Sequence, residues 1–137
     1  MKEQQRIRPV QEFKTLRYRH QLLQVDALQE VELKSRIIAK SSLERQFRQL
    51  SHQWENETGM LSDLSQKVIH PAYQRIIGMG QDAVPLLLNE LSKRPNHWFW
   101  ALRSITGANP VKPEHRGRIK LMAQDWLCWG RDHGYEC

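Results

Sequence analysis

The sequence predicts an all-α fold, in which a long N-terminal helix precedes a small helical bundle. Neither glycine nor proline occurs between residues 10 and 58. Apolar side chains recur at intervals of three and four residues through most of the chain, which is the period of one helix face. No pair of alternating segments joined by a turn marks a β-hairpin. The 137 residues suffice for about one domain.

Residues 1–40 are predicted to form a basic N-terminal helical arm, and residues 41–137 a helical domain. The pairs Glu30–Lys34 and Glu32–Arg36 are spaced four residues apart, which favours a helix in the arm. The arm also holds an apolar series at helical spacing, and such a series would allow two chains to form a homodimer. Its members are Phe13, Leu16, His20, Leu23 and Ala27.

Two alternatives remain open for the arm. One is a strand, because four apolar residues also fit an alternating pattern that Gln29 breaks. These residues are Val25, Ala27, Val31 and Leu33. The other is a pair of helices with a break near Lys40, in place of one long helix.

The domain is expected to open with a helix over residues 41–58. Ser41-Ser42-Leu43-Glu44 matches a capping box, in which the hydroxyl and the carboxylate bond backbone N–H groups at the helix start. Gly59 would end this helix by taking the left-handed conformation. The predicted buried face consists of Leu43, Phe47, Leu50 and Trp54.

Two shorter helices are expected next. Proline suits the first turn of a helix, so one helix begins at Pro71 and stops at Gly78 or Gly80. Asp82 would cap the following helix, which ends before Pro95. The predicted inward residues of the two helices are Tyr73, Ile76, Ile77, Val84, Leu87, Leu88 and Leu91.

Two further helices complete the prediction. Asn96 would cap the first of them, and Gly107 would end it. The last helix is expected from about Pro113 to His133, weakened by Gly117. The predicted inward residues are Trp98, Ala101, Leu102, Ile105, Ile119, Met122, Trp126 and Trp129.

Residues 71–107 resemble one HEAT-type helical repeat. The stretch IGMGQDAVPLLLNEL at residues 77–91 has the glycine turn and the Ala-Val-Pro-x-Leu helix of that family. The turn Arg94-Pro95-Asn96 and a second apolar helix follow. The resemblance implies one HEAT-like helical hairpin. A solenoid is not implied, because arrays of this kind need about three or more stacked repeats.

Two segments also look like those of a group of short uncharacterised bacterial proteins. They are HPAYQ at residues 70–74 and WFWAL at residues 98–102, and the likeness covers roughly residues 41–135. It implies a bacterial origin and a non-catalytic role, and it supplies no activity.

The chain carries a net charge of +6, most of which belongs to its N-terminal third. Residues 1–50 hold 11 of the 21 Lys and Arg but only 6 of the 15 acidic residues. A basic arm can bind phosphates, so nucleic-acid binding is the alternative function. The candidate contacts are Arg6, Arg8, Arg17 and Arg19.

The sequence points to a cytoplasmic protein that does not enter a membrane. Residues 1–19 are polar and basic and lack the apolar core of a signal peptide. The longest uninterrupted apolar run is residues 83–88, which is far short of a membrane span. Cys128 and Cys137 are too few for a disulfide framework, so a reducing compartment is expected.

No catalytic, cofactor or metal site is predicted, and the chain is not expected to be an enzyme. Its six histidines are at least 18 residues apart, which excludes the close pairs typical of zinc sites. Cys128 stands in the apolar run Trp126-Leu127-Cys128-Trp129 and is predicted to be a buried structural thiol. Gly78-Met79-Gly80 follows a helix and lacks the phosphate-loop pattern.

The tryptophans carry the functional prediction. Successive helical residues point about 100° apart, so Trp98, Phe99 and Trp100 cannot all face one core. Either the helix is buried between two neighbours, or aromatic surface is exposed. Exposed tryptophan near arginine is typical of protein-binding hot spots. The prediction is a non-catalytic protein–protein interaction module, adaptor or antitoxin-like, that binds another protein through Trp100, Arg103 and Trp129.

Overall fold

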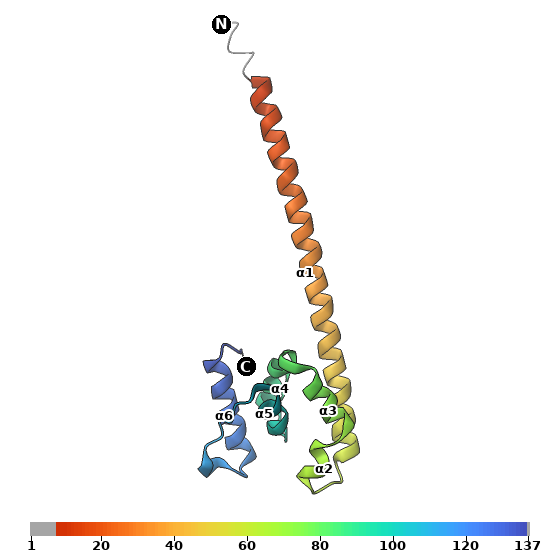
Figure 1. Ribbon diagram of the computed structural model, residues 1–137, viewed down its shortest axis with the longest axis vertical. Helices are drawn as coiled ribbons and strands as arrows, with labels where there is room; N and C mark the ends of the chain where they lie inside the picture. The colour runs from red at the N-terminus through yellow and green to blue at the C-terminus, as the bar shows by residue number, and fades with distance from the viewer. Residues whose placement is uncertain (1–7, 137) are drawn as a thin grey trace. The chain divides into compact units, whose positions relative to one another are not determined.

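The computed structural model describes the backbone of residues 8–136 and the side chains of residues 26–136. This part of the chain contains helices and no strand, which confirms the all-α prediction (Figure 1). Two compact units divide the chain, Met1–Ser42 and Leu43–Cys137. The helices are α1 (Arg8–Thr58), α2 (Leu64–Val68), α3 (Pro71–Gly78), α4 (Val84–Lys93), α5 (Phe99–Thr106) and α6 (Ile119–Asp132), with short 3-10 turns η1 (Gly80–Ala83) and η2 (Pro113–His115).

α1 is one continuous helix of 51 residues, which confirms the long N-terminal helix, contradicts the helix start expected at Ser41, and rules out both alternatives for the arm. Ser41-Ser42-Leu43-Glu44 lies inside the helix and does not start it, there is no break near Lys40, and residues 25–33 form no strand. Helical hydrogen bonding continues because no proline or glycine occurs between residues 10 and 58. Ion pairs four residues apart, such as Lys34 with Glu30 at 3.2 Å, add to the helix in the arm.

Glycines act at helix ends only partly as predicted. Gly107 has φ +71° and ends α5, as expected from a left-handed residue. Gly59 follows the end of α1 but has no positive φ, so the left-handed ending predicted there is wrong. Gly117 has φ +81° and interrupts the segment that begins at Pro113. The last helix therefore begins at Ile119 and not near Pro113.

The helix caps predicted at Asp82 and Asn96 are also wrong. Asp82 lies within η1, before the first residue of α4. The Asn96 side chain accepts a hydrogen bond from the N–H of His97 at 2.8 Å, outside the helix that it was expected to cap. α2 was not predicted, because five residues are too few to show a helical period.

The core of the unit Leu43–Cys137 is built around four aromatic rings. Trp98 lies 4.4 Å from Trp54 and 5.5 Å from Tyr73 between ring centroids, and Phe47 completes the cluster at 6.1 Å from Trp98. The Trp54 indole donates a hydrogen bond to the carbonyl of Lys67 at 2.8 Å. These contacts fix α2, α3 and the start of α5 against the last turns of α1.

α4 lies at the centre of the bundle and packs against α5 and α6, while α3 packs against α5 (Figure 1). Its predicted inward residues are all fully buried, which accounts for this central place. They are Val84, Leu87, Leu88 and Leu91. α5 and α6 both pack on α4, and the segment between them lines one side of a cleft.

Candidate partner-binding cleft

α5 divides the three consecutive aromatic residues between the core and the surface. Trp98 is fully buried in the aromatic cluster, Phe99 is half-buried, and Trp100 is 50% exposed. Trp100 and Arg103 are three residues apart, so they lie on the same side of α5. Of the two alternatives for this helix, burial between two neighbours or exposed aromatic surface, the structure thus shows the second, with an arginine beside the exposed ring.

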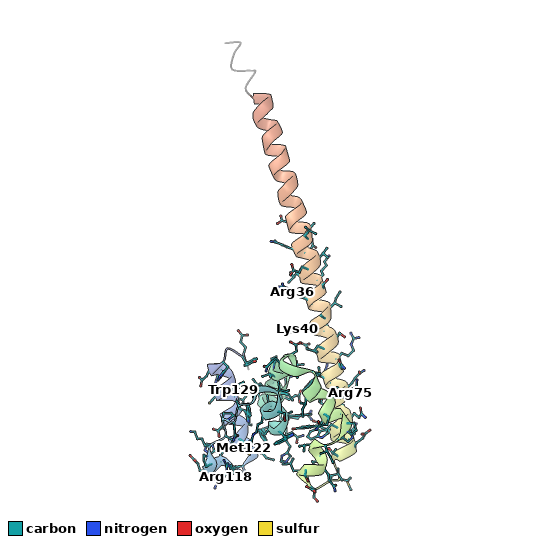
Figure 2. The ribbon with its side chains drawn as sticks, in the orientation of Figure 1. Arg36, Lys40, Arg75, Arg118, Met122 and Trp129 are labelled. Atoms are coloured by element: carbon teal, nitrogen blue, oxygen red, sulfur yellow. The ribbon has the colours of Figure 1, made fainter. Side chains whose placement is uncertain are left out.

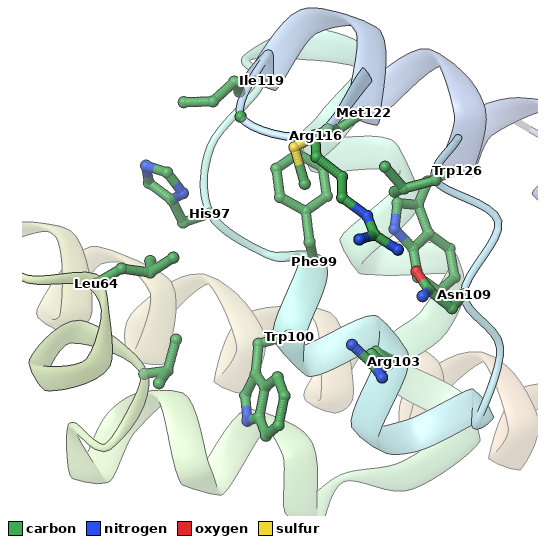
Figure 3. Close-up of a pocket in the computed structure, with 13 residues that line it drawn as sticks. Leu64, His97, Phe99, Trp100, Arg103, Asn109, Arg116, Ile119, Met122 and Trp126 are labelled. Carbon is green, nitrogen blue, oxygen red and sulfur yellow. The ribbon is translucent and has the colours of Figure 1, made fainter. Parts of the chain in front are cut away.

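A cleft of about 680 Å³ opens beside Trp100 and Arg103 and is called here the α5 cleft (Figure 3). This volume falls within the range of about 300–1,000 Å³ usual for ligand-binding sites. Four segments contribute its walls: α2, the start of α5, the loop before α6, and α6. The lining residues are Leu64, Val68, His97, Phe99, Trp100, Arg103, Asn109, Val111, Arg116, Gly117, Ile119, Met122 and Trp126.

A polar clamp holds the loop before α6 in place. Asp125 of α6 accepts hydrogen bonds from the backbone N–H of Lys112 at 3.1 Å and from the His115 ring at 2.7 Å. Burial raises the pKa of Asp125, but these hydrogen bonds and the positive charges of Lys112 and His115 leave the pKa below its ordinary value. The clamp therefore works with an ionised carboxylate and places Arg116 at the cleft.

The α5 cleft is positively charged. Arg103 and Arg116 line it, and no aspartate or glutamate does so. Within the part of the chain that the structure describes, neither guanidinium forms an ion pair or a hydrogen bond with another residue. Burial and the charge of Lys67 lower the pKa of His97, so His97 is neutral near pH 7. The cleft thus offers two free cationic groups beside apolar walls.

Trp129 does not join Trp100 and Arg103. It is half-buried near the end of α6, whereas Met122, nearer the start of that helix, lines the cleft (Figure 2). Its ring stacks on His133 at 4.3 Å and on Tyr135 at 5.9 Å. Of the three residues predicted to bind a partner, the structure brings together only the two on α5.

The thiol prediction is wrong, because Cys128 is exposed. It lies on the outer side of α6 between half-buried neighbours, and the Arg131 guanidinium donates to its sulfur at 3.2 Å. An apolar run on an amphipathic helix always includes positions that face outward. The apolar character of residues 126–129 was therefore not enough to predict whether Cys128 is buried.

The arginines proposed to bind nucleic acid fall largely outside the described part of the chain. Arg6 lies outside the described residues. Arg8, Arg17 and Arg19 belong to α1, but their side chains are outside the described set. This prediction therefore stays a prediction.

Among the side chains of residues 26–136, no three of His, Cys, Asp or Glu are grouped so as to hold a metal ion. No helix in the described part of the chain is long and apolar enough to cross a membrane. No protein-family model, curated protein or solved structure matches the chain.

Most of the cleft wall was not predicted from the sequence. Phe99, Arg116 and Met122 line the cleft, although none was singled out as a functional residue. Gly117 was the one available signal, since a glycine inside a segment expected to be helical can mark a turn instead.

Proposed function

We propose that this protein is a non-catalytic protein–protein interaction module, adaptor or antitoxin-like, whose α5 cleft binds a segment of another protein. The bound segment carries an apolar or aromatic side chain next to a carboxylate. The guanidinium groups of Arg103 and Arg116, unpaired among the described residues and in a cleft that no carboxylate lines, are the observation that carries this proposal.

The apolar walls explain why the partner must bring an apolar group. Trp100 is 50% exposed and Leu64 is 46% exposed, and both line the cleft. A large apolar surface left in water favours association, because covering it releases about 25 cal/mol per Å². Tryptophan and arginine together are the residues most enriched where a few contacts supply most of the binding energy.

The charges explain why that group must stand beside a carboxylate. A guanidinium binds a carboxylate through two parallel hydrogen bonds, and this pairing is stronger where water is excluded. Arg103 comes from α5 and Arg116 from the loop before α6, so a carboxylate between them would join both walls. A basic segment would meet like charge and would be rejected.

The extent of the apolar surface favours a protein segment over a small metabolite. The chain around α2 also exposes Met60 and Ile69, at 99% and 68%. Exposed apolar side chains therefore stand on both sides of the cleft residue Leu64 in the sequence. A peptide of several residues can cover such a surface, whereas a small metabolite covers only the cleft itself.

The test is selection of a random peptide library on the full chain, followed by titration calorimetry of the enriched peptides. We expect peptides that combine an aromatic or aliphatic residue with Asp or Glu. Trp100→Ala should weaken their binding about 30-fold, which is typical of a hot-spot residue. Arg103→Glu should weaken it by about tenfold or more, because it replaces attraction by repulsion.

Arg75→Glu is the matched control, since it makes the same charge change at an exposed residue of α3 outside the cleft lining. It should leave the affinity within about twofold of wild type. Enriched peptides that bind Trp100→Ala and Arg103→Glu as tightly as wild type would contradict the proposal. The same holds if no peptide that depends on these residues is enriched.

Salt dependence distinguishes nucleic-acid binding by the arm from peptide binding in the α5 cleft. Binding to arbitrary duplex DNA or RNA through arginines falls steeply and log-linearly with salt. Binding of an apolar side chain in the α5 cleft persists at high salt and depends on Trp100. Tight binding of DNA that is lost in an Arg8→Ala, Arg17→Ala, Arg19→Ala triple variant, with no peptide selected, would favour the alternative function.

A further inference from the structure

Over residues 26–42, the described side chains of α1 include an unpartnered helix face. Every side chain from residue 26 to residue 42 is exposed, and three large apolar ones lie on one side of α1. Leu28 is 70% exposed, Val31 62% and Ile38 68%. With Ser35 and Ser42 they repeat at intervals of three and four residues, so they share one face.

These five residues are called here the uncharged stripe, because none of the charged residues of the segment lies on that face. Residues 26–42 include six charged residues, and a 3.6-residue period places all of them outside the stripe. Leu33 and Ile37 lie on the side opposite the stripe and are 58% and 56% exposed. A single helix in water is marginal unless an amphipathic face packs on something. The stripe therefore needs a partner.

The charges of this segment identify the partner. The acidic residues come first and the basic residues second, with Leu33 at the centre. They are Asp26, Glu30 and Glu32, followed by Lys34, Arg36 and Lys40. A second copy running parallel would set acid beside acid and base beside base. A second copy running antiparallel would set the acidic half of each helix beside the basic half of the other.

We infer that two copies of this chain associate through the uncharged stripes of α1 in an antiparallel pair centred on Leu33. In that register Leu28 of each copy lies level with Ile38 of the other, and Val31 lies level with Ser35. Two layers of large apolar side chains thus flank two layers in which valine meets serine. Each acidic residue lies level with a basic one, as Glu30 does with Arg36.

The residues closest to the two-fold centre are compatible with this pairing. Glu32 of one copy comes near Glu32 of the other, and Lys34 near Lys34. Each of these is already paired within its own helix, Lys34 with Glu30 at 3.2 Å and Glu32 with Arg36. The like residues therefore meet as neutral ion pairs and repel one another little.

Disulfide trapping tests the pairing and its direction. Cys128→Ser and Cys137→Ser are made in the full chain, and Leu28→Cys or Ile38→Cys is added separately. We expect a covalent dimer on oxidation of a mixture of the two chains, and none from either chain alone. In the antiparallel pair the two copies of position 28 are about 15 Å apart along the axis, well beyond the ~7 Å between Cα atoms that a disulfide spans.

Leu33→Cys is the matched control, because it lies on the same helix with similar exposure but opposite the stripe. Crosslinking of Leu28→Cys alone at the rate of the mixture would show a parallel pair and overturn the inference. Crosslinking of Leu33→Cys at that rate would show random collisions and would also overturn it.

Sedimentation of the unmodified chain gives a second readout. At about 100 µM protomer, the weight-average mass should rise toward twice the 16.3 kDa of one chain. Val31→Asp should return it to one chain, and Leu33→Asp should not. A mass of one chain for the wild type, or equal effects of the two variants, would contradict the inference. The inference does not use the α5 cleft, so either proposal can fail alone.

Discussion

Tyr73→Phe removes a hydroxyl that substitutes for a missing helix cap. The Tyr73 hydroxyl accepts a hydrogen bond from the N–H of Ala101 at 2.9 Å and donates one to the carbonyl of His97 at 3.0 Å. The N–H of Ala101 belongs to the first turn of α5, and the N-cap residue Trp98 supplies no side-chain acceptor. Without the hydroxyl this N–H is buried and unsatisfied.

The expected cost is about 2 kcal/mol of unfolding free energy. Leaving one buried backbone donor unpaired costs about 1–3 kcal/mol, and loss of a helix cap costs about 1 kcal/mol. The two figures describe the same lost hydrogen bond and are not added. Tyr73 is fully buried, so water does not replace the lost group. A loss of this size should lower the Tm by roughly 10 °C in a unit of this length.

Urea unfolding followed by tryptophan fluorescence measures the effect, because Trp54 and Trp98 contact the Tyr73 ring. The midpoint should fall while the slope with urea stays unchanged. Tyr135→Phe is the control, since this half-buried ring also stacks on a tryptophan but its hydroxyl has no hydrogen bond among the described residues. Equal stability of Tyr73→Phe and Tyr135→Phe would refute the reasoning.

Three further predictions concern the same unit. The pKa of His97 in the folded protein is lowered by burial and by the charge of Lys67. As the pH drops below 6.5, His97 therefore takes up a proton more readily in the unfolded chain than in the folded one, and the free energy of unfolding should fall. Urea unfolding at about pH 7.5 and about pH 5.5 should show this fall, smaller in His97→Gln. Asp125→Asn should cost about 1–2 kcal/mol near pH 7 in the same assay. Since the pKa of Asp125 is below 3.8 in the folded protein, the stability that its ionisation adds is present above 3.8 and disappears as the pH falls through the folded pKa. Gly107→Ala should lower stability by about 1–2 kcal/mol in thermal unfolding, because φ is +71° although space for the methyl group is open. Gly78→Ala, with equal space and no positive φ, should be neutral or stabilising.

The sequence predicted helices well where an apolar period and a breaker agreed. Residues 84–93 show both, and α4 has the predicted buried face, with Pro85 in its first turn. The capping sequence at Ser41 misled because a cap acts only where the chain before it is not helical. Gly117 was recognised as weakening a helix, but the sequence did not show that its left-handed backbone would end one.

The candidate site could be predicted only where local spacing along one helix fixes the residues. The three-residue spacing of Trp100 and Arg103 fixes them on one side of a helix whatever the tertiary structure is. No such spacing relates Trp129 to α5, because Trp129 belongs to α6. Its ring stacks on Tyr135, where the chain turns back and the N–H of Tyr135 bonds the carbonyl of Gly130 at 2.8 Å. Arg116 reaches the cleft through the clamp on Asp125, a contact between residues whose pairing no local pattern reveals.

The indole N–H signals in a nitrogen–proton correlation spectrum test the central claim most directly, that a partner segment binds in the α5 cleft. The chain has five tryptophans, and each gives one signal that substitution can assign. On titration with a selected acidic–aromatic peptide, the Trp100 signal should shift most, while those of Trp54 and Trp129 stay in place. A Trp100 signal that does not move while the peptide binds, or a largest shift at Trp129, would contradict the account.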